Sequence, residues 1–191
     1  KCIYSVSDTN IYNQSAIMIN YKVKTIGLYN IFFKVNNNYT IIFKKNTFEF
    51  LYYSKKSMQP GVVNYITTDY VDNRATYGVG RDINKNETNI FILLYLLSNN
   101  YLDEIKNYPI IDREGKKYKY NLKSMGDDSY SINLEEIDMK DLGEIEHTDI
   151  FTWGIFLPKA KNSIFIDSDL GVINKTIFKK KFLKIVAQKV K

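Results

Sequence analysis

The chain has 191 residues, a formal net charge of +6 and one cysteine. This length suits one domain that buries its own core without disulfides or metal, so we expect a single domain over residues 1–191. A single cysteine excludes an internal disulfide and every cysteine metal cluster. No apolar run approaches the roughly 18 residues of a membrane-spanning helix.

Most of the chain before residue 80 has the two-residue periodicity of half-buried strands. Residues 16–25 alternate Ile17, Ile19 and Tyr21 with polar side chains, which indicates a strand with one buried face. The remaining strands are expected at residues 3–6, 28–35, 39–44, 47–53, 62–71 and 75–79, with a hairpin joining 28–35 to 39–44 and a loop at 55–61. Short turns between consecutive strands predict an antiparallel meander.

Residues 90–97 are eight apolar residues in succession and do not fit a strand that faces water. Thr88 or Asn89 can accept a hydrogen bond from the free N–H groups of a first helical turn, and leucine is a good helix former. The sequence therefore predicts a short helix at residues 88–97. A helix that is apolar on all sides has to be enclosed, and the strands on either side of it can enclose it.

The chain returns to strands after this helix. Past a helical turn before Pro109, strands are expected at residues 116–122, 130–137, 163–166, 172–178 and 182–186. Residues 145–157 are rich in aromatic and β-branched side chains, which favours a late strand carrying Trp153 and Phe156. The predicted fold is mainly β, with a curved antiparallel sheet wrapped around one short apolar helix.

Residue types that commonly carry catalysis are sparse. His147 is the only histidine, and no Gly-x-Ser-x-Gly motif accompanies it. Gly78 and Gly80 lack the third glycine and the following helix of a dinucleotide site. Residues 167–171 resemble the start of a calcium loop, but the glycine stands one position early, so a hairpin turn is expected there. The sequence predicts a protein that is not an enzyme and needs no metal or other cofactor.

Four aromatic residues form the candidate ligand-binding site: Phe91 and Tyr95 on the expected helix, and Trp153 and Phe156 on the expected late strand. The alternative is that they are ordinary core. An incompletely closed sheet around a helix nevertheless leaves room for an apolar guest. The expected partner is therefore a hydrophobic small molecule or an acyl chain.

The densest basic run is Lys179, Lys180 and Lys181, between Phe178 and Phe182. Such a run can bind nucleic acid or lipid head groups, or it can keep an edge strand from pairing with other sheets. We favour the edge-strand interpretation, so nucleic acid is not the expected partner. A nucleic-acid-binding β-domain, a protein-interaction module and peripheral contact with a membrane stay open as alternatives.

The order of elements resembles that of a known family. It is carried by Tyr21-x-Val23 with Ile26-Gly27, the apolar run at 90–97, residues 112–115 with Tyr118, and the hairpin at 163–173. These residues resemble the bacterial periplasmic domain-of-unknown-function family three-one-zero-eight, over residues 21–185. The resemblance implies a half-barrel similar to the lipoprotein carriers LolA and LolB, and an exported protein of the periplasm or cell envelope whose leader has been removed. It carries over no catalytic residues, and it leaves open whether Cys2 is attached to lipid.

Overall fold

The computed structural model describes residues 1–78, 81–126, 128–137, 149–157 and 159–189, and strands dominate it. The chain divides into two compact units, one formed by Lys1–Lys85 with Glu144–Asp149 and the other by Asn86–Gly143 with Ile150–Lys191. A single domain over residues 1–191 stays a prediction. The mainly β class is confirmed, and none of the sheets formed by the described residues closes into a barrel.

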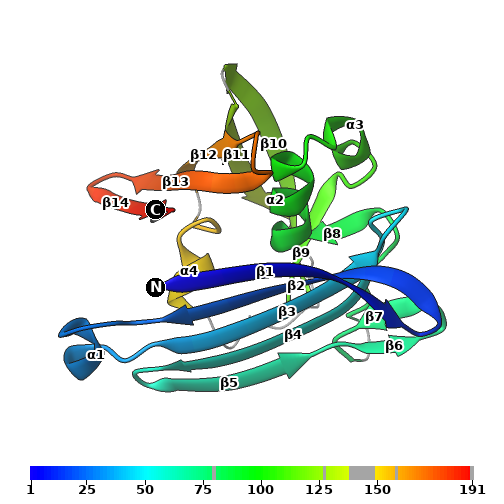
Figure 1. Ribbon diagram of the computed structural model, residues 1–191, viewed down its shortest axis with the longest axis horizontal. Coiled ribbons are helices and arrows are strands. Elements are labelled where there is room, and N and C mark those ends of the chain that lie inside the picture. The colour runs from blue at the N-terminus through cyan, green and yellow to red at the C-terminus, as the bar shows by residue number, and fades with distance from the viewer. Residues whose placement is uncertain (79–80, 127, 138–148, 158, 190–191) are drawn as a thin grey trace. The chain divides into compact units, whose positions relative to one another are not determined.

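A five-stranded antiparallel sheet in the order β1-β2-β3-β4-β5 makes up most of the first unit (Figure 1). Its strands are β1 (Cys2–Ile11), β2 (Gln14–Lys24), β3 (Asn36–Lys44), β4 (Phe50–Gln59) and β5 (Val62–Thr67). The strands β6 (Asp69–Val71) and β7 (Arg74–Thr76) form a separate pair. Every strand of the larger sheet pairs with the next one along the chain, so the expected meander is confirmed.

One face of this sheet carries a row of buried apolar side chains. Ile19 on β2 lies opposite Ile41 on β3, which lies opposite Tyr53 on β4, and all three side chains are buried. Burying a side chain of this size contributes about 1.5–3 kcal/mol relative to leaving it exposed. The alternation of apolar and polar residues seen in the sequence therefore sets which face of β2 and β3 packs inward.

The expected strand at residues 28–35 is wrong. The chain forms a short helix there, α1 (Tyr29–Phe32), and β3 pairs with β2 instead. Gly27 has φ of +63°, which turns the chain out of the sheet. The base of the excursion is closed by Thr25, whose N–H donates to the Val35 carbonyl at 3.1 Å and whose Oγ1 accepts from the Val35 N–H at 3.0 Å.

The expected loop at residues 55–61 is also wrong, because β4 continues to Gln59. Lys55 and Ser57 point to the buried face of the sheet, whereas Lys56 and Met58 are exposed. Polar residues alternate in and out here, so the hydrophobic pattern that signals a strand is missing from the sequence.

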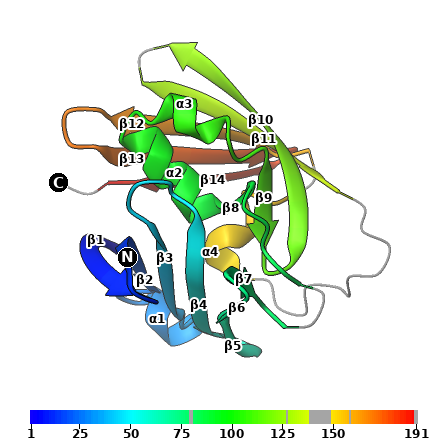
Figure 2. The ribbon, with the colours of Figure 1, turned by 90° about the vertical axis from the view of Figure 1, so that its right-hand side faces the viewer.

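The second unit is built on a seven-stranded sheet in the order β14-β13-β12-β11-β10-β9-β8 (Figure 2). The strands are β8 (Glu87–Asn89), β9 (Ile110–Arg113), β10 (Lys116–Gly126), β11 (Ser129–Glu136), β12 (Lys161–Asp167), β13 (Val172–Lys180) and β14 (Leu183–Gln188). All neighbours are antiparallel except β8 and β9, which are parallel. The hairpin predicted around residues 167–171 joins β12 to β13.

The predicted helix is confirmed as α2 (Ile90–Ser98). Asn89 is its N-cap, and the Asn89 Oδ1 accepts a hydrogen bond from the Phe91 N–H at 2.9 Å. The helix packs against β8 and β9 on one side of the sheet order and against β12 and β13 on the other. A second short helix, α3 (Leu102–Ile105), follows where the helical turn before Pro109 was expected. No helix within the described residues is long and apolar enough to cross a bilayer.

We expect Asn89→Ala to lower the free energy of unfolding by about 0.5–2 kcal/mol, because the buried Phe91 N–H loses its acceptor. Urea unfolding followed by circular dichroism measures this change. Asn89→Ser keeps a capping oxygen and should lose less. Equal losses in the two variants would show that the cap is not the cause.

The expected late strand at residues 145–157 is wrong where the structure describes it. A short helix, α4 (Ile150–Trp153), stands there and includes Trp153, and Phe156 follows in the next turn with its N–H donating to the Trp153 carbonyl at 3.2 Å. A Cβ added to Gly154 would lie 3.1 Å from the Phe178 Cδ2. Glycine therefore lets this turn lie directly on β13. Residues 145–148 lie outside the described part of the chain.

Candidate functional site

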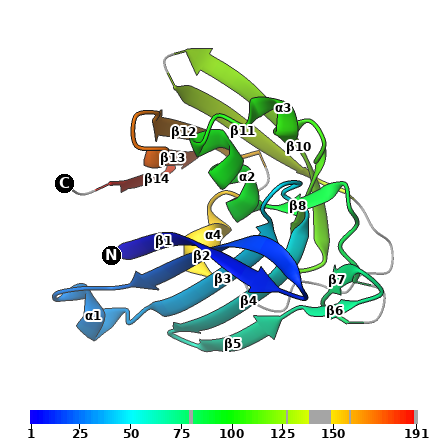
Figure 3. The same cartoon turned by 45° about the vertical axis from the view of Figure 1, so that its right-hand side comes forward.

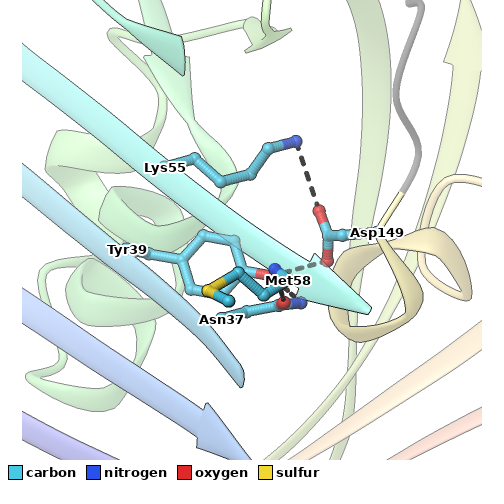
Figure 4. A network of polar contacts seen from close by, with 5 residues as sticks. All are labelled: Asn37, Tyr39, Lys55, Met58 and Asp149. Atoms are coloured by element: carbon cyan, nitrogen blue, oxygen red, sulfur yellow. Dashed lines mark hydrogen bonds and ion pairs between the residues drawn. The ribbon is translucent and has the colours of Figure 1, made fainter. Parts of the chain in front are cut away.

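A buried polar network lies on the inner face of the first sheet (Figure 4). Tyr39 on β3 and Lys55 on β4 are directly opposite each other, and both side chains reach Asp149. The Tyr39 hydroxyl donates to the Asp149 Oδ1 at 2.6 Å, and the Lys55 Nζ lies 3.4 Å from the Asp149 Oδ2. Asn37 completes the network: its Nδ2 donates to the Tyr39 hydroxyl at 3.1 Å, and its Oδ1 accepts from the Met58 N–H at 3.0 Å.

All of these side chains except Met58 are at most 1% exposed, so the network is shielded from water. A charge this deep is tolerated only when it is paired and hydrogen-bonded, and Lys55 with Asp149 meets that condition. The network joins β3 and β4 to Asp149. Its arrangement suits a structural role within the first unit.

A second buried charge cluster lies in the second unit. The Lys117 Nζ is 2.5 Å from the Glu87 Oε2 and 2.8 Å from the Asp112 Oδ2, and all three side chains are buried. Asp112 and Lys117 are register partners across the β9–β10 hairpin, and Glu87 begins β8. One ammonium thus serves two carboxylates.

Burial and the neighbouring charges shift the pKa values of Asp112 and Lys117 in opposite directions. Burial raises the pKa of Asp112, and the nearby Lys117 ammonium reduces this shift without cancelling it. For Lys117, burial alone would lower the pKa, but the Asp112 and Glu87 carboxylates outweigh it, so the pKa is raised. Lys117 is therefore held in its charged form as the counterion of the cluster.

The Phe156 ring packs against the Arg113 guanidinium and the Tyr118 ring. The Arg113 guanidinium carbon is 4.5 Å from the centroid of the Phe156 ring, and the Tyr118 ring centroid is 4.9 Å from it. Burial raises the pKa of the Tyr118 hydroxyl, opposed by Arg113. Arg113 is buried, and its Nε and Nη2 have no hydrogen-bond partner among the described residues. These two N–H groups are donors directed at no described acceptor, and an anionic or carbonyl oxygen would suit them.

The four predicted ligand-binding residues all lie in the second unit, in separate aromatic groups. Phe91 is buried and stacks on Phe151 of α4, with ring centroids 6.3 Å apart. Tyr95 is half-buried and stacks on Tyr101 at 6.5 Å. Phe156 is buried beside Tyr118, and Trp153 is 36% exposed. The groups of Phe91 and Phe156 are neighbours in the sequence. Phe151 of α4 stacks on Phe91, and Phe156 in the turn after α4 packs against Tyr118.

Arg113, Tyr118 and the Lys117 cluster were not among the site residues predicted from the sequence. A signal was present: Asp112 and Lys117 flank a tight turn, so a hairpin with Glu114 and Gly115 as its loop places them opposite each other. Glu87 could not be found in this way, because its pairing depends on the parallel contact between β8 and β9.

Two other candidates came from the sequence: His147 and the basic run at residues 179–181. His147 lies outside the described residues. The basic run stands at the end of β13, where Lys179 faces Lys184 on the edge strand β14 and Phe182 is fully exposed in the turn. Among the residues that the structure describes, no group of three or more His, Cys, Asp or Glu side chains could hold a metal ion.

The chain was compared with known protein families, curated proteins and solved structures. No protein-family model matches the chain, and no curated protein or solved structure matches it either.

Proposed function

We propose that this chain is a non-enzymatic, exported protein of the periplasm or cell envelope that binds a hydrophobic ligand in its second unit. The exported location rests on the resemblance in the order of elements. The observation that supports binding is the packing of α2 against strands on both sides of the sheet order, β8 and β9 on one side and β12 and β13 on the other.

This packing favours a sheet that curves around the helix. Neighbouring strands lie about 4.8 Å apart, so β9 and β13, four places apart in the order, would be separated by about 19 Å in a flat sheet. A helix with its side chains is only about 10–12 Å across. Contact with both sides supports a sheet that curves around the helix, and we propose a half-barrel of the kind that LolA and LolB have.

The side chains around α2 suit an amphiphilic guest. Tyr95 and Trp153 are partly exposed, so apolar surface is available where the helices meet solvent. Arg113 supplies unpartnered donors beside Phe156, and these suit a ligand with an anionic or carbonyl-bearing end. A molecule with an acyl chain and a polar head has both features.

We expect an acyl chain or a hydrophobic dye to bind with micromolar affinity and to shift the emission of Trp153, the only tryptophan. Burying about ten methylenes at roughly 0.8 kcal/mol each gives an upper bound of about 8 kcal/mol, which is of micromolar order. Fluorescence titration of the purified chain measures the affinity. Tyr95→Gln and Phe156→Gln should weaken it.

Tyr12→Gln is the matched control, because Tyr12 is an exposed tyrosine of the first unit. Folding of every variant is checked by circular dichroism. If neither lipid nor dye binds the wild-type chain, the proposal is wrong and a protein-interaction module becomes the better explanation.

A nucleic-acid-binding role is the second candidate, and one observation favours it. Phe182 is fully exposed between Lys180 and Lys181 on one side and Lys184 on the other, which is how single strands are held by stacking and charge. Salt-sensitive retention on single-stranded DNA, lost when Lys179, Lys180 and Lys181 are replaced by serine, would put this candidate first. No retention at low salt would remove it.

A further inference from the structure

An apolar excursion projects from one end of the first sheet. Between β2 and β3, the side chains of Leu28, Ile31 and Phe32 are 76%, 75% and 85% exposed. Ile26 and Phe33 in the same segment are also exposed. Large apolar side chains gathered in this way on a surface mark a place where the protein meets an apolar partner.

The neighbouring turn adds to this surface. Strand pairing places the β4–β5 turn at the same end of the sheet as α1, as Figure 1 and Figure 3 show. Val63 and Tyr65, just after that turn, are 80% and 66% exposed, and Met58 just before it is exposed as well. We call the two segments, residues 26–34 and 58–65, the apolar end of the first unit.

Among the described residues, the exposed charges around the apolar end all have one sign. Exposed lysines surround it: Lys1, Lys22, Lys24, Lys34 and Lys56. The sequence contains no Asp or Glu in residues 1–7, 20–43 or 53–68, which are the strand segments that meet here. Asp149 is buried and paired with Lys55, and Asp8 pairs with Lys45 further along the sheet. The apolar side chains thus sit in a positive field.

We propose that the apolar end docks on an anionic lipid bilayer. Apolar and aromatic side chains ringed by lysines match a membrane interface, where the side chains enter the acyl boundary and the ammonium groups reach anionic head groups. The hydrogen bonds between Thr25 and Val35 close the base of the excursion, so it is presented from the sheet in a defined place. This surface belongs to the first unit and is separate from the ligand site proposed for the second.

Sedimentation with vesicles tests the docking. The chain should bind vesicles that contain phosphatidylglycerol more tightly than vesicles of phosphatidylcholine alone, and the difference should shrink as salt is raised. Ile31→Ser combined with Phe32→Ser should weaken partitioning to both vesicle types by about tenfold or more. Lys24→Ser combined with Lys34→Ser should weaken binding to the anionic vesicles by about tenfold and leave the neutral ones unchanged.

Matched controls come from the second unit. Phe182→Ser with Val186→Ser, and Lys179→Ser with Lys181→Ser, alter exposed residues of the same types. These controls should bind vesicles as the wild type does. If they lose as much binding as the variants of the apolar end, or if the wild type does not bind vesicles, the proposal is wrong.

Two further readouts separate the alternatives. Light scattering of the wild type and of the Ile31→Ser/Phe32→Ser variant should give the same mass, and a lower mass for the variant would show that the apolar end joins two copies instead. Dye binding reported by Trp153 should be unchanged in that variant. A Tyr95 variant should lose dye binding and keep vesicle binding, which would show that the two sites act separately. The result for one proposed site therefore does not decide the result for the other.

Discussion

Lys117→Met is expected to lower the free energy of unfolding of the second unit by about 3–5 kcal/mol. Lys117 is the cation for both Glu87 and Asp112, and all three side chains are buried. Removing the ammonium takes away the cation that both carboxylates share in a water-poor site, which is the costly way to break a buried ion pair. Urea unfolding at neutral pH measures the loss.

The companion variants separate charge from packing. Glu87→Gln and Asp112→Asn added to Lys117→Met remove the stranded charges, so the triple variant should recover much of the lost stability. Lys117→Met with a loss below about 1 kcal/mol would mean that the carboxylates reach water or another cation.

The pH dependence has a definite sign. Burial raises the pKa of Asp112 above 3.8, so the native chain keeps that proton to a higher pH than the unfolded chain, and this group's contribution to stability falls as pH rises through that window. The pKa of Lys117 is raised above 10.5. Its contribution is fully present below that pH and is lost as pH rises through the higher native value. The gap between wild type and Lys117→Met should therefore close at strongly alkaline pH.

The sequence predicted the elements whose local chemistry and tertiary packing agree. Helix α2 has an uninterrupted apolar run and a capping asparagine, and both features are evident in the order of the residues alone. The alternation of Ile17, Ile19 and Tyr21 likewise identified β2 and its buried face. In these places the hydrophobic periodicity and the capping residue determine the secondary structure, because no competing pattern is present.

The elements that the sequence did not predict are those in which polar residues face the core or apolar residues face solvent. Lys55 and Ser57 face the core, so the part of β4 after residue 54 looked like a loop. Leu28, Ile31, Phe32 and Phe33 are apolar yet exposed, so the segment that contains α1 looked like a strand. In both places distant residues decide the outcome: Asp149 pairs with Lys55, and β3 pairs with β2 in place of the excursion. A local pattern does not contain that information.

The candidate site was predictable only in part. Phe91, Phe156 and Tyr95 were chosen because they are aromatic and lie near the helix, and the structure places all three in the same unit. Their partners Phe151, Tyr118 and Tyr101 depend on tertiary packing and on α4, which was expected to be a strand. Aromatic content could be read from the sequence, but the pairing of the rings could not.

Asp149→Ala is expected to destabilise the first unit by about 3–5 kcal/mol. The change removes the carboxylate that pairs with Lys55 and accepts the Tyr39 hydrogen bond, and both groups are almost fully buried. The loss of this ion pair from a buried ammonium and of this acceptor from a buried phenol combines two large penalties. Hydrogen exchange should show the loss of protection in β3 and β4, with the strands of the second unit changed much less.

The matched comparison is a double-mutant cycle. Lys55→Met alone should cost less than Asp149→Ala, because Asp149 keeps the Tyr39 hydroxyl as a donor. Lys55→Met combined with Asp149→Leu replaces the ion pair by apolar groups and should be far more stable than the sum of the two single changes predicts. Additive losses would mean that Lys55 and Asp149 do not depend on each other. A strong coupling would instead show that Asp149 is held on the first sheet by this charge, at the point where the chain passes into the second unit.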